Sequence, residues 1–155
     1  MNISCCGSTE PLTRAQWMRL LALAPEQLLD AFIRPVAQRA AYSFLRKPEA
    51  GLVMVEGQTG ATRFNLGEML VTRCTVRLQG EQECLGYAWV QGNKPEHATL
   101  AALGDAFMQL AEYNKPFTEQ LFSVLQQKEA ERTLAQEQEV APTRVEFFTM
   151  VRGED

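Results

Sequence analysis

Leu52-Val53-Met54-Val55 is an unbroken apolar run of strand length, and the turn-forming glycines Gly57 and Gly60 follow it. A short apolar run bounded by glycines is typical of a strand inside a sheet. We therefore predict that Leu52–Val55 forms a central strand, and that residues 57–67, ending in Phe64-Asn65-Leu66-Gly67, form the loop that leads to its neighbour.

The segment after this loop alternates between apolar and polar residues. In residues 68–78 one face would carry Leu70, Cys74, Val76 and Leu78, and the other Arg73, Thr75 and Arg77. Gln79–Glu83 then has the composition of a hairpin loop, and Leu85–Val90 is rich in residues that favour strands. Residues 52–91 are thus predicted to form an antiparallel meander.

Helices are predicted before the meander. Thr13 and Gln16 have capping-box spacing at the start of a helix over 12–23, and Pro25 begins a second short helix, so that helices cover about 12–32. Residues 37–46 could form helix or strand. Their alanine content favours helix, but the following Lys47–Gly51 has the composition of a hairpin turn.

Two amphipathic helices are predicted after the meander, over 95–139. Pro95 begins the first, whose apolar residues recur at spacings of three and four, and Pro116 begins the second, whose part from Gln126 to Glu139 is polar and solvated. Pro142 ends it, and residues 144–151 have the composition of a final strand that returns to the sheet. The prediction is an α+β fold in a single domain, 1–155, with a flexible start at 1–11.

Charge and composition limit the possible functions. The net charge of −4 gives no basic surface of the kind that binds nucleic acid or anionic membranes, and no apolar run is long enough to span a bilayer. The first eleven residues lack a basic leader followed by an apolar run, so we expect a cytoplasmic protein. Neither Cys5 and Cys6 nor Cys74 and Cys84 have metal-finger spacing, and free thiols are expected in a reducing compartment.

The single histidine argues against the common catalytic constellations. His97 is the only residue of its type, so the chain can supply only once the residue that histidine-rich zinc sites and the usual nucleophile–histidine constellations need. It lies in the first turn of the helix that begins at Pro95, where it could donate to a phosphate or play a structural role in the helix. No catalytic, cofactor-binding or metal-binding residue is predicted in this chain.

Arg73 and Arg77 share the polar face of one predicted strand. This face could hold a phosphorylated ligand or an acidic partner, or it could be a solvated surface on which the arginines pair with glutamates across the strands. The glycines at 57, 60 and 67 match no phosphate-binding motif, and Glu68 has no partner visible in the sequence that would make it a base. The candidate phosphate contacts are Arg73, Arg77 and His97.

The C-terminal residues carry many large apolar side chains for a terminus. Phe147, Phe148, Met150 and Arg152 either belong to a strand that completes the sheet or enter another chain, where Phe, Met and Arg are favoured. They are the candidate contacts with another subunit.

Four blocks of sequence carry a resemblance to a known family. They are Glu49–Val55, residues 64–78, Gly86–Gly92 and Arg144–Gly153. Together they resemble the PhnG family of phosphonate carbon-phosphorus lyase system proteins. The likeness extends from about Trp17 to the C-terminal block, which is its most specific part; at Thr99 the chain departs from the family's acidic residue while keeping His97.

The resemblance implies a subunit of a core complex with H, I and J type partners. That complex attaches a phosphonate such as methylphosphonate to the ribose C1 of a nucleoside triphosphate with release of the base. Base displacement belongs to the I subunit, and radical chemistry with an iron-sulfur cluster and S-adenosylmethionine to the J subunit, so this chain itself needs no cofactor. The family implies no catalytic residue in the G subunit.

Three functions remain open from the sequence. The first is an accessory subunit with no activity alone. The second is a subunit that contributes Arg73, Arg77 and His97 to a phosphate site shared with another chain, and the third is a free-standing module that binds phosphonate or nucleotide.

Overall fold

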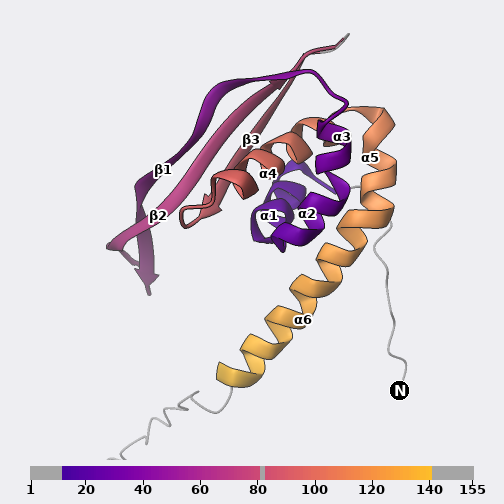
Figure 1. Cartoon of the computed structure of the whole chain (residues 1–155). Coiled ribbons are helices and arrows are strands. Elements are labelled where there is room, and N and C mark those ends of the chain that lie inside the picture. Colours follow the sequence, from indigo (N-terminus) through magenta and orange to yellow (C-terminus); the bar gives the residue numbers. More distant parts are fainter. Residues whose placement is uncertain (1–11, 81–82, 141–155) are drawn as a thin grey trace, which may run out of the picture.

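A computed structural model of the chain shows helices packed against one face of a three-stranded sheet (Figure 1). It describes residues 12–80 and 83–140. The elements follow in the order α1 (Arg14–Leu23), α2 (Glu26–Phe32), α3 (Arg34–Ala37), β1 (Tyr42–Thr59), β2 (Thr62–Leu78), β3 (Cys84–Gln91), α4 (Pro95–Met108), α5 (Ala111–Phe117), the π-helical turn η1 (Thr118–Phe122) and α6 (Ser123–Val140). The predicted α+β fold with helices before and after an antiparallel meander is confirmed.

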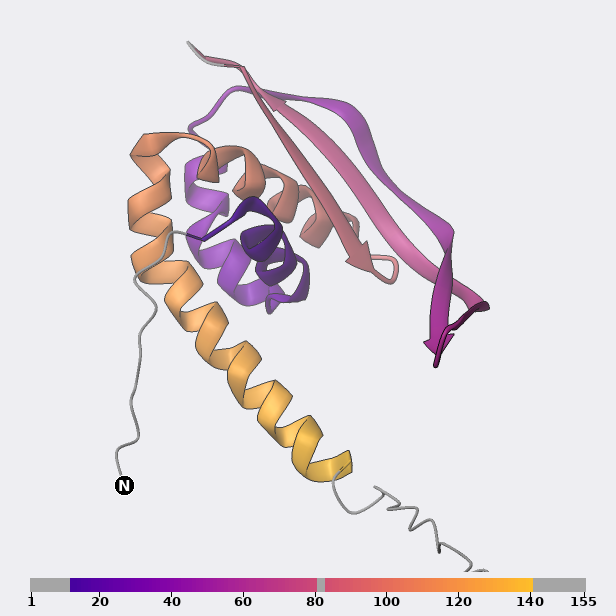
Figure 2. The ribbon, with the colours of Figure 1, turned by 180° about the vertical axis from the view of Figure 1, so that it is seen from behind.

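The sheet has the order β1-β2-β3, and both pairs are antiparallel. β1 and β2 pair from Tyr42 opposite Leu78 to Thr59 opposite Thr62, whereas β3 pairs only with Val71–Leu78 of β2. Beyond Val71 the sheet therefore continues as a hairpin of two strands. We call this hairpin, residues 52–70, the arm; it projects past the helices in both ribbon views (Figures 1 and 2).

Three predictions about the strands are wrong. Leu52–Val55 lies in an edge strand, because β2 is the central one. Lys47–Gly51 is no turn but part of β1, where shifts of register between Phe44 and Glu49 accommodate Pro48. Phe64–Gly67 lies inside β2, and the turn of the hairpin is formed at Gly60, whose φ of 60° favours glycine.

The core lies between the sheet and α4. Cys74, Val76 and Leu78 are buried on the inner face of the sheet, as their alternation predicts, while Leu70 on the same face is 42% exposed. α4 packs on β2 and β3 and much less on β1. Leu70 is exposed because it lies in the arm, beyond the end of β3, where no described helix covers the sheet.

The N-terminal helices begin as predicted. The backbone N–H of Thr13 donates to Oε1 of Gln16 at 2.8 Å, which caps α1, and α2 begins directly after Pro25. The open alternative at 37–46 is resolved in favour of strand: α3 ends at Ala37, and β1 begins at Tyr42.

The second C-terminal helix begins earlier than predicted. α5 starts at Ala111, so Pro116 lies inside a helix rather than at its first turn. Proline has no N–H to donate to the preceding turn, and the π-helical turn η1 follows within two residues. The remainder, α6, is mostly exposed, as predicted, and its C-terminal half projects from the body (Figure 2).

Some predictions fall outside the described residues. They concern the flexible start at 1–11, the end of the helix at Pro142 and the final strand over 144–151. Among the described residues, no helix is long and apolar enough to cross a membrane.

Gly86 sets how closely α4 approaches β3. A Cβ at this position would overlap the carbonyl oxygen of Ala102 and lie 2.8 Å from the Cβ of Ala106. Neither of these two atoms can rotate away from the added Cβ, because the first belongs to the backbone and the second is bonded directly to it. We predict that Gly86→Ala lowers the free energy of unfolding by about 1–3 kcal/mol, measured by urea denaturation. Gly51→Ala is the control, because its Cβ would meet only Arg73 Nη2 at 3.8 Å; equal losses for the two variants would contradict this packing.

Candidate functional site

Asp105 is a fully buried carboxylate at the centre of the fold. Arg14 donates to it through Nε at 3.1 Å and Nη2 at 2.7 Å, Trp17 through Nε1 at 2.8 Å, and the backbone N–H of Tyr87 at 3.0 Å. These donors come from α1 and β3, while Asp105 itself lies on α4. One carboxylate thus joins three elements.

The contacts of Asp105 are those of a structural group. Its two oxygens accept four hydrogen bonds, close to the capacity of a carboxylate, which leaves little room for a substrate. The hydrogen bond and charge of Asp105 raise the pKa of the Arg14 guanidinium, which also lies 5.5 Å above the Tyr87 ring. Sequence reasoning missed this cluster, although an acidic residue within the apolar run Ala98–Met108 was a signal for it.

His97 lies in the first turn of α4, as predicted, but faces the interior. It is 3% exposed, and its Nε2 is 2.9 Å from the carbonyl oxygen of Leu21 on α1. A carbonyl only accepts, so Nε2 carries the proton and donates. This placement favours the structural role for His97, a link between α4 and α1.

Arg73 and Arg77 lie together on the outer face of the sheet, away from α4 and His97. Arg73 donates to Glu49 at 2.8 Å, and its guanidinium carbon lies 5.4 Å from the centre of the Trp89 ring. These are the cross-strand contacts of a solvated face. The structure therefore brings together two of the three candidate phosphate contacts but not the third.

The Nε atoms of both arginines are buried, and neither has a hydrogen-bond partner among the described residues. A buried donor without an acceptor costs about 1–3 kcal/mol, so such atoms are uncommon in a finished structure.

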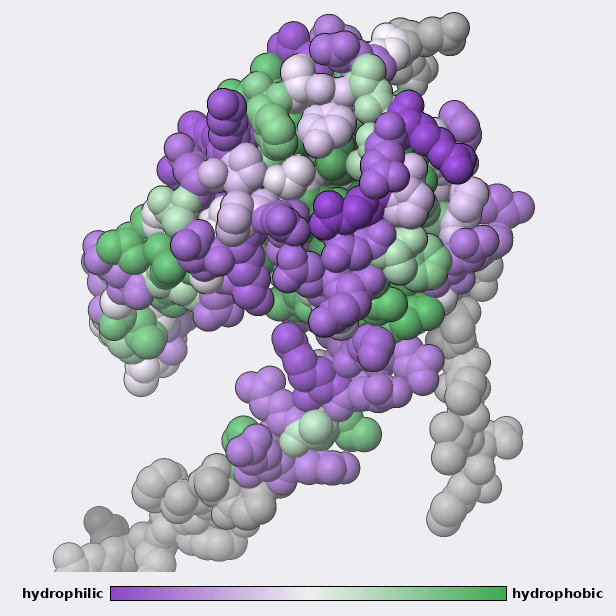
Figure 3. Space-filling view, viewed as in Figure 1, coloured by the Kyte–Doolittle hydropathy of each residue, from purple (hydrophilic) through white to green (hydrophobic). Residues whose placement is uncertain are grey.

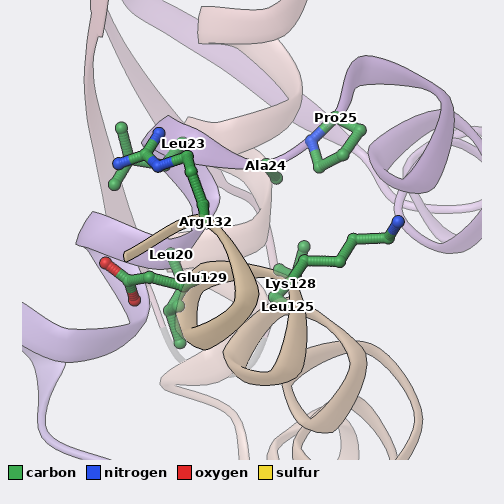
Figure 4. A pocket seen from close by; sticks show the side chains of 8 residues that line it. All are labelled: Leu20, Leu23, Ala24, Pro25, Leu125, Lys128, Glu129 and Arg132. Carbon is green, nitrogen blue, oxygen red and sulfur yellow. The ribbon is translucent and has the colours of Figure 1, made fainter. Parts of the chain in front are cut away.

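Three hollows on the surface of the described residues do not include Arg73, Arg77 or His97 in their lining. The hollow in Figure 4 lies between α1 and α6, has a volume of about 130 Å³, and is too small for a nucleotide. Its apolar floor includes Leu20 and Leu125, and Lys128, Glu129 and Arg132 lie at its rim, where Glu129 already pairs with Arg19 at 2.7 Å. Two more open hollows have volumes of about 490 and 470 Å³. Each is lined by one arginine and one glutamate, so neither holds a cluster of cations.

Metal-binding groups do not converge in the part of the chain that the structure describes. No three His, Cys, Asp or Glu side chains there are close enough to hold a metal ion. Cys74 and Cys84 are free and buried, and burial raises the pKa of the Cys74 thiol, which keeps it protonated and poorly nucleophilic. Cys5 and Cys6 lie outside the described residues.

Exposed apolar side chains gather on the arm. They are Leu52 (62% exposed), Met54 (55%), Phe64 (45%), Leu66 (66%) and Leu70 (42%), and the end of the arm shows apolar colour in Figure 3. A folded chain that works alone rarely leaves such a group uncovered. The candidate interface residues Phe147, Phe148, Met150 and Arg152 lie outside the described residues, so the arm is the interface candidate that the structure adds.

Comparison with known proteins gives one consistent result. The family described as phosphonate metabolism protein PhnG matches residues 12–153. The chain is also similar to the alpha-D-ribose 1-methylphosphonate 5-triphosphate synthase subunit PhnG of Rhizobium meliloti (strain 1021), with 40% identity over 147 residues. The alignment covers 92% of this chain and 90% of that relative.

The Asp105 cluster leads to a stability prediction. Asp105→Ala leaves Trp17 Nε1 and the Tyr87 N–H without their acceptor and Arg14 without its counter-charge, and should lower the free energy of unfolding by about 3–5 kcal/mol in chemical denaturation. Glu129→Ala removes the ion pair with Arg19, whose side chain is 65% exposed while that of Glu129 is 24% exposed. Its loss should lower the free energy of unfolding by less than about 1 kcal/mol. Similar losses in the two variants would show that Asp105 does not hold the fold.

Proposed function

We propose, because the chain belongs to the PhnG family of phosphonate metabolism proteins, that it is an accessory subunit of a synthase that makes alpha-D-ribose 1-methylphosphonate 5-triphosphate. The reaction joins methylphosphonate to the ribose C1 of a nucleoside triphosphate and releases the base. In this proposal the chain supports the assembly in which the reaction takes place, and other subunits supply the reacting groups.

The observation that carries the proposal is the uncovered arm. The five large apolar side chains of the arm are exposed on two strands that no described helix covers; they are Leu52, Met54, Phe64, Leu66 and Leu70. Burial of such side chains yields roughly 25 cal/mol per Å² of apolar surface, so a partner that covers the arm gains binding energy from it. Asp105 and His97 are the buried side chains that could take part in acid–base chemistry, and both instead link α4 to α1.

The partners follow from the family. We expect H, I and J type subunits, with base displacement on the I type and iron-sulfur chemistry with S-adenosylmethionine on the J type. Phe147, Phe148, Met150 and Arg152 remain candidates for a further contact with one of them. The whole assembly is expected in the cytoplasm.

A second candidate role rests on the two arginines of the outer sheet face. The buried, unpartnered Nε atoms of Arg73 and Arg77 support the idea that another molecule supplies an acceptor. A phosphate of the nucleotide, held jointly with another subunit, would satisfy this need.

Omission of this chain tests the accessory role. When it is co-expressed with the other subunits, we expect it to copurify with them in native mass determination, and we expect base release from a nucleoside triphosphate to be lost in a preparation made without it. The isolated chain should show no turnover. Saturable binding of nucleotide or phosphonate by the isolated chain, together with full turnover of the remaining subunits, would instead support a free-standing binding module.

Substitution of the arginines tests the second role. Arg77→Ala and Arg73→Ala should each raise the apparent KM for nucleotide by about tenfold if the arginine contacts a phosphate, with the mass of the assembly unchanged. Arg132→Ala is the control, since Arg132 is exposed on α6, outside both the arm and the sheet face that carries Arg73 and Arg77. An unchanged KM in both test variants would contradict phosphate binding at this face.

A further inference from the structure

The outer face of the three-stranded sheet carries two exposed aromatic side chains. Tyr87 and Trp89 lie two residues apart on β3 and therefore point to the same face, where Tyr87 is 38% and Trp89 53% exposed. The described helices pack on the opposite face of the sheet, so none of them covers these rings. Exposed aromatic rings on a sheet offer a flat surface on which the base of a nucleotide can stack.

Each of the two rings has an arginine beside it. Arg73 on β2 is in register with Trp89, and its guanidinium carbon lies 5.4 Å from the centre of that ring. Arg14 lies 5.5 Å from the centre of the Tyr87 ring, but it also binds Asp105 and so belongs to the buried cluster. Trp89 is the larger and more exposed of the two rings, so it is the one on which a base has room to stack.

The same face has an excess of positive charge, although the net charge of the chain is −4. Among the described residues, the outward positions in register beside Arg73 and Arg77 add one more cation, Arg46, and one carboxylate, Glu49. Glu49 pairs with Arg46 at 3.3 Å and with Arg73 at 2.8 Å, whereas Arg77 has no ion pair among the described residues. Arg77 is therefore the cation that is free to bind an anion, and a guanidinium suits phosphate oxygens well.

The exposed ring and the free cation lie at the two ends of this face. Trp89 is in register with Arg73, and Arg77 lies four residues farther along β2, so the two rows are about 13 Å apart along the strand. An extended nucleoside triphosphate has a comparable length, with an aromatic base at one end and a polyanion at the other. Thr75 and Tyr87 are paired in register between the two ends, where the ribose would lie.

We propose that Trp89 stacks on the base of the nucleoside triphosphate while Arg77 binds its phosphate chain. Arg73 is a positioning residue in this site, because it holds the Trp89 ring and its own charge is engaged by Glu49. The face is open, so another subunit supplies the opposite wall of the site. This inference deepens the second candidate role and rests on the proposed function, because the ligand is the substrate of the synthase.

Replacement of Trp89 in the assembled complex tests the contact with the base. Trp89→Leu should raise the apparent KM for adenosine triphosphate about tenfold because the stacking is lost, with kcat changed by less than about twofold. Trp89→Phe keeps an aromatic ring and should raise this KM by no more than about threefold. Both variants should copurify with the other subunits and keep the wild-type unfolding midpoint, because Trp89 is more than half exposed.

Tripolyphosphate, which has the phosphate chain but no base, separates the two contacts. We expect it to compete with adenosine triphosphate in the wild-type complex. Its inhibition constant should stay unchanged in Trp89→Leu and rise about tenfold in Arg77→Ala. Arg132→Ala on α6 is the control and should change neither this constant nor the KM. Failure of tripolyphosphate to inhibit the wild type would overturn the contact with Arg77.

The remaining outcomes each count against the inference. An unchanged KM in Trp89→Leu, or an equal rise of the KM and of the tripolyphosphate constant in that variant, overturns the base contact and leaves the accessory role standing. Loss of copurification in both Trp89 variants assigns the face to another subunit in place of the nucleotide. Full turnover of a complex made without this chain overturns the proposed function and the inference together.

Discussion

The buried carboxylate of Asp105 is the constraint on which the rest of the structure depends. It fixes α1 and β3 to α4 through Arg14, Trp17 and the Tyr87 N–H. A buried charge is tolerated only when such donors surround it, so the three elements must keep this arrangement. In this arrangement α4 lies so close to β3 that a side chain at position 86 would overlap Ala102. Gly86 permits the close approach because it has no side chain.

This arrangement places the helices over one side of the sheet and leaves the other side without cover from the described helices. α4 is held at β3 and reaches β2, so β1 receives little cover, and the arm beyond β3 receives none from the described helices. The packing of α4 against β3 and β2 thus also leaves the apolar residues of the arm exposed. A chain with a tightly built body and an open, apolar edge is suited to work inside an assembly.

Local patterns in the sequence predicted what depends on near neighbours. The alternation of residues 73–78 placed the two arginines outside and Cys74 and Val76 inside, and Thr13 and Gln16 marked the start of α1. Long-range contacts were not predictable in this way: Arg14 and Asp105 are 91 positions apart, and the link from His97 to Leu21 depends on how two helices pack. The run Leu52–Val55 predicted a central strand, which is wrong, because a local apolar run does not tell which strands lie on either side of it.

A cryo-EM reconstruction of the assembled complex would test the central claim most directly, through the solvent-exposed fraction of Leu52, Met54 and Leu70 within it. We predict that a different chain covers the arm and that these side chains, now 42–62% exposed, become buried. An assembled complex in which the arm still projects into solvent would contradict it.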